Sequence, residues 1–315
     1  MKTLSYIIFL GIFTAFSSAL QAQQVHQLTQ FSTNTFVYNP AIAGNSLNDL
    51  MASASYRKQW SGGFEGEEPT TMLLSVHSNL SADRSVGLGG MLFHDKTGPT
   101  SRMGVQLAYA YHLPLDRYGE QFLSFGVSGT IMQYSLNFSD LDLRDAGDLA
   151  AMEASASQMA ADANFGAFLY GENYFVGASA LQLAQTALNL SERSIETQEE
   201  TLSLSRHFYF MGGYRYDFDK DGKDAGFSLM PYGVLKYVKA VPIQFEIAAR
   251  LLYKDKYWGG IGMRTGDAIA VHLGLEIDDG LSLQYSYDYI TSEIGTVSNG
   301  SHEITLAYRM SVWNR

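Results

Sequence analysis

The 315-residue chain contains no cysteine, few charged residues and, beyond its first 22 residues, no long apolar run. The lack of cysteine excludes a disulfide framework, thiolate metal sites and a cysteine nucleophile. Charged residues make up 17% of the chain, below the usual figure of about 25%, and hydrophobic residues make up 46%, which excludes a disordered chain. With 21 basic against 32 acidic residues, the formal net charge is -11, so no nucleic-acid partner is expected.

The first 22 residues have the pattern of a secretory signal peptide. Met1 and Lys2 form a positively charged start, residues 6–16 are largely apolar, and residues 17–22 are mostly small or polar. Cleavage after Ala19 and cleavage after Ala22 both fit the usual pattern loosely, and both stay open. A buried N-terminal helix is the less favoured alternative. The pattern therefore predicts export of the chain.

After residue 22 no stretch approaches the ~18 to 20 consecutive apolar residues that a membrane-spanning helix needs. The exported chain is then either soluble or a membrane-spanning closed β-barrel, because a barrel satisfies every backbone hydrogen bond internally.

Alternation of apolar and polar residues favours the barrel. From Ile243 to Tyr253 every second residue is apolar, and the residues between them include Glu246 and Arg250. Segments 267–278, 302–312, 102–113 and 121–135 repeat this pattern. Weaker candidates lie near 50–60, 70–80, 84–94, 163–170, 173–182, 206–217, 226–238, 256–265 and 280–290. We therefore predict an all-β fold, an antiparallel transmembrane outer-membrane β-barrel of about 14 strands over residues 50–315, with its apolar face toward lipid.

A soluble β-sandwich also alternates and is the competing fold. The polar face here is rich in Gly, Ser, Thr and Gln rather than in Lys and Glu, which is typical of a narrow lumen. Aromatic residues such as Tyr56, Trp60 and Trp313 recur toward strand ends, where an interfacial girdle would place them. Both features favour the membrane barrel.

Connection lengths give a second expectation, because outer-membrane barrels alternate long outer loops with short inner turns. The predicted outer connections are 61–69, 95–100, 136–162, 183–205, 239–241, 266 and 291–300, and the longest connections all belong to this class. Residues 150–163, rich in Ala, Met and Ser, predict a short helix at the barrel mouth, either a partner-binding lid or a solvated loop.

No motif for catalysis, cofactor binding or metal binding is present. Asp217, Asp219 and Asp221 begin like a calcium loop, but position twelve is Ser228 instead of Glu, so a solvated turn is favoured. The seven histidines lack metal-site spacing, and no G-x-S-x-G motif occurs. We expect no catalytic residues, no metal, no cofactor and no enzymatic activity, with an outer-membrane lipase as the minor alternative.

The most distinctive region is 30–62. It contains Asn39-Pro40-Ala41-Ile42-Ala43-Gly44 and Arg57-Lys58-Gln59-Trp60-Ser61-Gly62. The two elements, in this order, resemble those of the PorP/SprF family of type IX secretion system outer-membrane proteins. The similarity continues through 69–71, 87–98, 231–236 and 257–268, and so covers nearly all of the exported chain. The acidic stretch from Glu65 to Glu68 departs from the family pattern and puts the role of that loop in doubt.

These two elements hold the candidate site residues, which are Asn39, Pro40, Ala41, Ala43, Gly44, Arg57, Gln59, Trp60 and Gly62. Pro40 keeps Asn39 out of the helical region, and Gly44 can adopt positive φ. Arg57 and Gln59 share the polar face of the first strand and should face the lumen, where Arg57 needs a carboxylate. Expected partners are Glu246, Glu276 or Glu303. The cluster either anchors residues 23–49, an N-terminal periplasmic or plug segment, or contacts a partner.

The resemblance implies a role in type IX secretion, or in holding secreted adhesin-like proteins at the cell surface, with a possible link to gliding motility. Its expected partners are other type IX secretion components, secreted surface cargo and outer-membrane lipid. The alternative is a passive channel or a transporter of hydrophobic solutes, because a barrel of this size lies between filled and open barrels.

Overall fold

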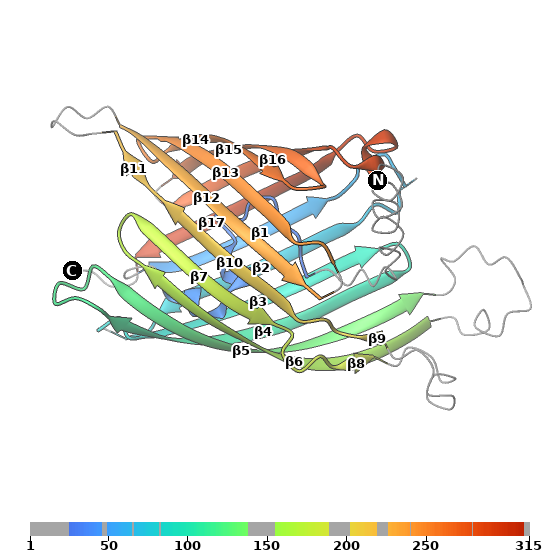
Figure 1. Ribbon diagram of the computed structural model, residues 1–315, viewed down its shortest axis with the longest axis horizontal. Helices are drawn as coiled ribbons and strands as arrows, with labels where there is room; N and C mark the ends of the chain where they lie inside the picture. The colour runs from blue at the N-terminus through green and yellow to red at the C-terminus, as the bar shows by residue number, and fades with distance from the viewer. Residues whose placement is uncertain are drawn as a thin grey trace, which may run out of the picture.

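The computed structural model describes residues 25–45, 49–64, 66–81, 83–137, 155–188, 202–218, 226–239, 241–278 and 280–311. Antiparallel strands dominate this part of the chain (Figure 1). The first strands are β1 (Asp49–Lys58), β2 (Thr70–Asn79), β3 (Val86–Thr97), β4 (Thr100–Pro114), β5 (Phe122–Asn137), β6 (Ser155–Tyr170) and β7 (Tyr174–Leu181). After them come β8 (Ala187–Leu188), β9 (Leu202–Ser203), β10 (His207–Tyr214), β11 (Tyr216–Asp217), β12 (Phe227–Val238), β13 (Gln244–Tyr253), β14 (Tyr257–Arg264), β15 (Ala268–Asp278), β16 (Leu281–Ile290) and β17 (Ser301–Ser311).

Fourteen strands close into a barrel, as the alternation predicts. Each strand pairs with its neighbour in sequence, β1 pairs with β17, and β10 pairs with both β7 and β12. The short β11 follows β10 after Arg215 and pairs only with β12 among the described residues. The β8–β9 ribbon forms a separate two-stranded sheet.

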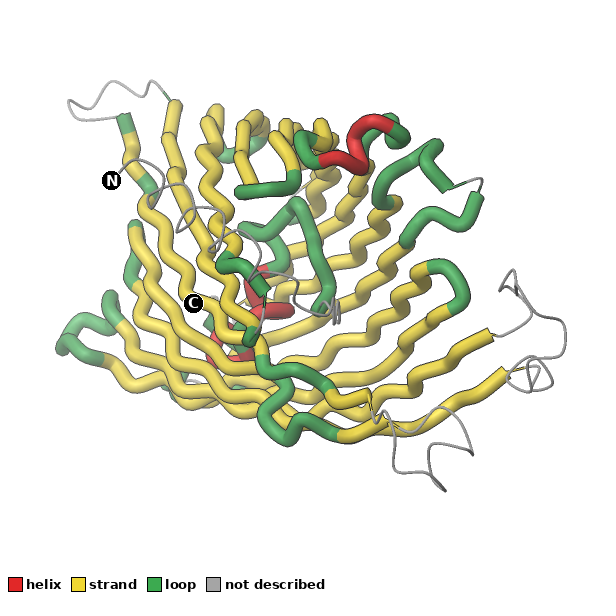
Figure 2. The backbone as a smooth tube through the Cα atoms, turned by 45° about the vertical axis from the view of Figure 1, so that its right-hand side comes forward, coloured by secondary structure: helices red, strands yellow, loops and turns green. Residues whose placement is uncertain are grey.

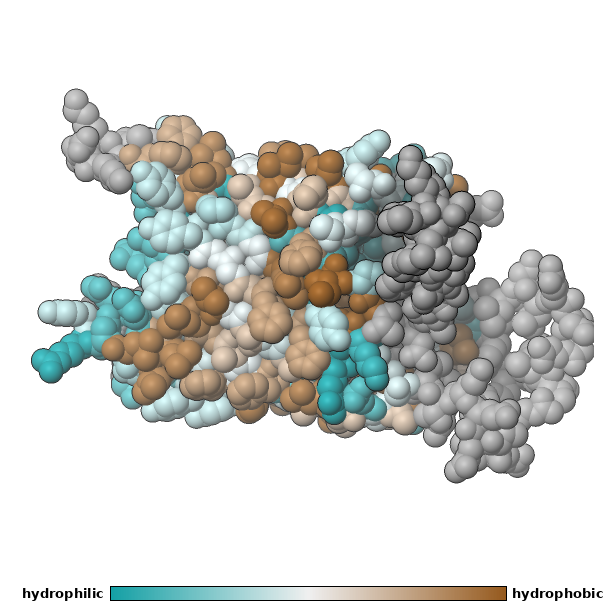
Figure 3. Space-filling model, in the orientation of Figure 1, coloured by the Kyte–Doolittle hydropathy of each residue, from teal (hydrophilic) through white to brown (hydrophobic). Residues whose placement is uncertain are grey.

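The barrel has its apolar residues outside and its polar residues inside. On β4, Met103 and Leu107 are 54% and 67% exposed, whereas Gln106 is 4% exposed and His112 is fully buried. On β15, Ile269 and its apolar neighbours on the same face are exposed in the same way. Figure 3 shows apolar patches gathered over the middle of one face of the barrel. This arrangement confirms the prediction of a lipid-facing barrel and rules out the soluble sandwich, whose apolar face would be buried.

Two ends of the barrel differ in their connections. At one end, which we call the short-turn end, the chain leads from β2 to β3, β4 to β5, β6 to β7, β11 to β12, β13 to β14 and β15 to β16. At the opposite, long-connection end it leads from β1 to β2, β3 to β4, β5 to β6, β7 to β10, β12 to β13, β14 to β15 and β16 to β17. The loop expected at 95–100 is shorter than predicted, because Thr97 pairs with Thr100 across a turn in which Gly98 has φ +54°.

The helix predicted over 150–163 is wrong where the structure describes it. Residues 155–163 belong to β6 and pair with β5 from Asn137 to Gly129. Ladder hydrogen bonds to an already extended neighbour override the helical propensity of an Ala-rich stretch. Residues 150–154 lie outside the described part of the chain, and so do residues 219–225 of the acidic turn.

Residues 25–45 run through the interior of the barrel. They include the short helix α2 (Thr35–Tyr38) and the 3-10 helix η2 (Pro40–Ile42); a second 3-10 helix, η5 (Glu293–Thr296), lies in the β16–β17 connection. Figure 2 shows the interior helices and the loop before them enclosed by strands. In the described residues we find no helix with the length and hydropathy to cross a membrane.

Candidate functional site: the lumen segment and its wall

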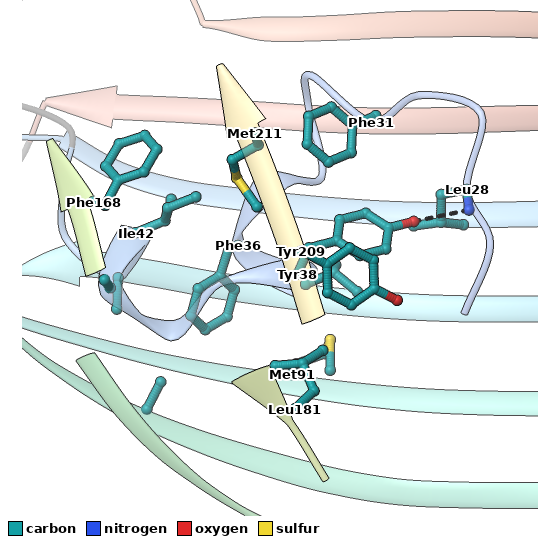
Figure 4. Packing of buried hydrophobic residues seen from close by; sticks show 14 of the residues in the cluster. Leu28, Phe31, Phe36, Tyr38, Ile42, Met91, Phe168, Leu181, Tyr209 and Met211 are labelled. Carbon is teal, nitrogen blue, oxygen red and sulfur yellow. Dashed lines mark hydrogen bonds between the residues drawn. The ribbon is translucent and has the colours of Figure 1, made fainter. Parts of the chain in front are cut away.

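An apolar cluster fixes the segment 25–45, called here the lumen segment, against the barrel wall. Its residues Leu28, Phe31, Phe36, Val37, Tyr38, Ala41, Ile42 and Ala43 are all at most 2% exposed. They pack against inward side chains of the wall that include Met91, Phe168, Leu181, Tyr209 and Met211 (Figure 4). The Leu28 N–H also donates to the Tyr38 hydroxyl at 2.9 Å, which folds the segment back on itself.

The Asn39-Pro40-Ala41-Ile42-Ala43-Gly44 element makes the closest contact with the wall. Asn39 caps η2, since its Oδ1 accepts from the Ala41 N–H at 2.9 Å. Its Nδ2 donates to the carbonyl oxygens of Ala167 on β6 and Ala178 on β7, at 3.1 and 3.3 Å. One amide thus ends its own turn and bridges two strands.

Polar wall residues bind two carbonyl groups of this element. Ser124 Oγ on β5 donates to the Ala41 carbonyl at 2.7 Å, and His112 Nε2 on β4 lies 2.8 Å from the Ala43 carbonyl. Tyr170 supports the imidazole, because its hydroxyl lies 2.9 Å from His112 Nδ1. Buried backbone carbonyls of an irregular segment therefore find partners in the wall.

Glycines in the wall make room for the element. A Cβ on Gly87 would lie 1.9 Å from the Ala43 carbonyl oxygen, and one on Gly126 would lie 2.3 Å from the Ala41 nitrogen. A Cβ on Gly166 would lie 1.9 Å from Asn39 Oδ1. The missing side chains let the backbone of the segment approach the wall at Gly87 on β3 and Gly126 on β5, and let the Asn39 side chain approach it at Gly166 on β6.

Arg57 ties the lumen segment to the opposite wall. It is 1% exposed; its Nη2 lies 2.8 Å from Asp288 Oδ2 and its Nη1 lies 3.5 Å from Glu303 Oε2. Arg57 Nη1 also donates to Thr29 Oγ1. The Thr29 and Gln30 N–H groups donate to the Glu303 carboxylate, and Thr29 Oγ1 donates to Asp288 at 2.9 Å. Strands β1, β16 and β17 therefore share one buried ion network with the segment.

A second group of charges continues this network toward the long-connection end. Arg264 lies 3.1 Å from Glu246, 3.4 Å from Asp288 and 2.7 Å from Asp267. Lys236 lies 3.3 Å from Glu246, and Gln27 donates to Asp267 at 2.8 Å. Of the partners expected for Arg57, the structure places Glu303 beside it, Glu246 beside Arg264, and Glu276 against the Gly280 N–H.

His26 contacts the opposite side of the lumen. Its Nδ1 lies 2.6 Å from Asp95 on β3, and Asp95 also pairs with Arg102 on β4. Asp95 is close to the end of β3 at Thr97, so residue 26 lies near the long-connection end. Gly44, whose φ is +74°, packs against Asn79 and Gly87 near the short-turn end. The segment thus runs from one end of the lumen to the other.

The remaining predicted residues lie apart from the lumen. Gln59 and Trp60 follow β1 in the 59–69 connection, where the Gln59 N–H donates to the Pro69 carbonyl and the Trp60 N–H to Ser301 Oγ. Gly62, with φ +77°, donates its N–H to Glu68 at 2.9 Å, which lowers the pKa of that carboxyl. The nine candidate residues therefore form two groups, the interior one containing Asn39 to Gly44 and Arg57, and the rim one containing Gln59, Trp60 and Gly62.

The sequence argument missed Thr29, Gln30, Asp288 and the wall glycines Gly126 and Gly166. Asp288 shares the inward face of β16 with Gln284 and Ser286, so alternation offered a signal for it. Thr29 and Gln30 offered none, because the segment has no periodic pattern and their carboxylate partners, Asp288 and Glu303, are more than 250 residues away in sequence. Within the described residues no cluster of three or more His, Asp or Glu side chains could hold a metal ion.

Several solved structures are similar to this chain at low sequence identity. The alignment with the Acinetobacter baumannii outer membrane protein Omp33 covers 84% of this chain and 96% of Omp33, with 9% identity and a TM-score of 0.42. The alignment with the CymD monoaromatic hydrocarbon channel covers 89% of this chain and 92% of that channel, with 10% identity and a TM-score of 0.47. The alignment with a Pseudomonas aeruginosa FadL homologue covers 84% of this chain and 89% of that homologue, with 9% identity and a TM-score of 0.42.

No curated protein matches the chain significantly. The model of the family described as "Type IX secretion system membrane protein PorP/SprF" matches residues 20–308, nearly the whole length. The match includes both the interior and the rim group of residues and all fourteen barrel strands up to Tyr308. A closed barrel with an apolar outer surface is the outer-membrane architecture, so the protein is located in that membrane. The chain belongs to the PorP/SprF family and is a membrane component of the type IX secretion system.

Proposed function

We propose that this protein is a plugged, non-enzymatic barrel that supports secretion or cell-surface attachment of adhesin-like cargo through protein contacts at its loops and rims. The filled lumen carries this proposal. Eight apolar residues of the lumen segment are at most 2% exposed, and Arg57 joins the segment to two strands through buried carboxylates. A lumen filled in this way favours protein contacts at the two ends over solute transport.

The proposal includes an orientation and a leader. The long-connection end faces the outside and the short-turn end faces the periplasm, as is usual for outer-membrane barrels. Residues 1–22 act as the signal peptide, and residues 23–49 form the plug. Other type IX secretion components contact the rim, where Trp60 and the 59–69 connection lie. Cargo attachment at this rim would account for a role in gliding motility.

Deletion of the gene tests the cargo role. The expected result is that at least one cargo protein is retained in the cell or shed into the medium, with display restored by the intact gene. Variants of the rim, such as Trp60→Ala, should reduce display while the barrel still reaches the membrane. Unchanged surface display of every cargo after deletion would refute the proposal.

Conductance separates this proposal from a passive channel. Purified protein in planar bilayers should show little steady current, and deletion of residues 25–44 should open a large conductance. A steady current through the intact chain would favour the channel instead. The lipase alternative predicts lipid hydrolysis by purified protein in detergent, and the proposed function predicts none.

A further inference from the structure

A cavity of about 500 Å³ lies beneath the lumen segment at the short-turn end. The segment contributes Ser32, Thr33 and Asn45 to its lining, and the wall contributes Arg250 and Trp258. The turns around Asp255 and Gly280 border it, so the cavity opens at the end that we assign to the periplasm. It lies outside the contacts that fix the segment through Arg57 and Asn39.

Arg250 differs from the other buried cations of the lumen. Arg57, Arg102, Lys236 and Arg264 each have a carboxylate oxygen within 3.5 Å. Arg250 is 8% exposed, and within the described part of the chain no carboxylate lies within 4.0 Å of it. Its contacts include a hydrogen bond to Gln30 Oε1 at 3.1 Å, the Tyr232 side chain, and the Trp258 ring, whose centroid is 5.8 Å from Cζ. A guanidinium stays charged in proteins, so this buried charge lacks a counter-ion.

Three unpaired polar atoms around Arg250 can only donate hydrogen bonds, while the Tyr232 hydroxyl and Ser32 Oγ nearby can donate or accept. Arg250 Nε, Gln30 Nε2 and Trp258 Nε1 are buried and find no partner among the described residues. A neighbourhood rich in unused donors favours a ligand that only accepts hydrogen bonds, which an ionised carboxylate does.

The charged residues that line the cavity indicate a ligand with a single negative charge. Its charged lining residues are three arginines, Arg215, Arg250 and Arg309, and two carboxylates, Asp255 and Glu276. One carboxylate balances this set, whereas a phosphate dianion would exceed it and meet the two acidic residues. Leu252 and Tyr308 add apolar surface that suits a peptide.

We infer that Arg250 and Trp258 form a binding site for a carboxylate presented on a polypeptide from the periplasmic side. The guanidinium would donate paired N–H hydrogen bonds to the two carboxylate oxygens, and the indole would cover the adjoining side chain. This inference rests on the proposed function only for the orientation of the barrel, which decides from which side of the membrane the peptide arrives. Binding by the purified protein does not depend on that orientation. Failure of the binding test and failure of the cargo test are therefore distinguishable.

Calorimetry of the full chain in detergent micelles tests the site. The probes are N-acetyl-glycyl-phenylalanine, its C-terminal amide, and N-acetyl-glutamyl-phenylalaninamide, which carries the carboxylate on a side chain. We expect at least one acid to bind and the neutral amide not to bind. Which acid binds tells whether a chain terminus or an acidic side chain is recognised.

Variants connect the binding to Arg250. Arg250→Gln should weaken binding of the acid by roughly 10- to 100-fold, because a charge-assisted pair is lost. Arg250→Lys keeps the charge but lacks the paired donors, and should weaken binding less. Arg117→Gln is the matched control, since Arg117 is exposed at the same end of the barrel but lies outside the cavity lining, and should change affinity by no more than about threefold.

Three results would overturn the assignment: equal binding of acid and amide, tighter binding of inorganic phosphate than of either acid, or an equal loss in Arg117→Gln and Arg250→Gln. The folded state of each variant is checked by its migration on an unheated denaturing gel. If Arg250→Gln does not fold, Arg250→Lys and Trp258→Phe carry the test, and undiminished binding in both would also refute it.

Discussion

A single methyl group on the wall should loosen the lumen segment. In Gly126→Ala the new Cβ would lie 2.3 Å from the Ala41 nitrogen and 2.4 Å from the Pro40 carbonyl carbon. Both are backbone atoms, so no side chain can rotate away. Ordinary contact begins at 3.4 Å, so the segment must shift by about 1 Å, which disturbs the Ser124 hydrogen bond to Ala41.

The expected cost is about 1–3 kcal/mol, as for other overpacked sites. If this cost falls on the bound segment alone, the fraction of molecules with a displaced segment rises roughly 5- to 150-fold. Gly129→Ala on the same strand is the control, since its Cβ would meet nothing within 4 Å. Both variants make the same change in strand propensity, so their difference isolates the contact.

Cysteine labelling measures the displaced fraction, and the cysteine-free chain makes it specific. Ser286 faces the lumen and is 1% exposed, and its Oγ has no hydrogen-bond partner within the described residues. Ser286→Cys therefore removes no hydrogen bond of the described residues and places a thiol in the lumen whose labelling can be measured. Its labelling rate follows the open population when closing is fast. Gly126→Ala should raise the rate and Gly129→Ala should not. Equal rates in the two variants would show that the close approach at Gly126 does not hold the segment.

Two further predictions concern the buried ions and the orientation. Arg57→Met leaves two buried carboxylates without their cation and should destabilise the protein by about 3–5 kcal/mol, measured by thermal unfolding. Arg117→Met, at an exposed position, should change the free energy of unfolding by less than about 0.5 kcal/mol. Similar losses of stability in both variants would contradict the buried ion network. On whole cells, Thr97→Cys at the long-connection end should react with a membrane-impermeant maleimide and Lys254→Cys at the opposite end should not, whereas the reverse pattern would invert the proposed orientation.

The sequence predicted the barrel wall well because side-chain direction in a strand is a local property. Successive residues point to opposite faces, so Met103 and Gln106, three positions apart, lie on opposite faces of β4. The apolar Met103 faces lipid and the polar Gln106 faces the lumen. Fourteen strands follow from fourteen such segments. Local reasoning failed at 155–163, where pairing with β5 outweighs the helical propensity of the Ala-rich stretch.

The lumen segment shows where local reasoning ends. Its motif predicts a turn at Asn39 and Pro40 and a positive φ at Gly44, and both are present. The sites of contact depend on barrel closure, which brings Gly166 to Asn39 and Asp288 to Thr29, residues more than 120 positions apart. Repeating alternation is enough to determine which side of each strand meets lipid. Only the tertiary structure decides what fills the lumen, because an aperiodic segment takes its partners from strands that are distant in sequence.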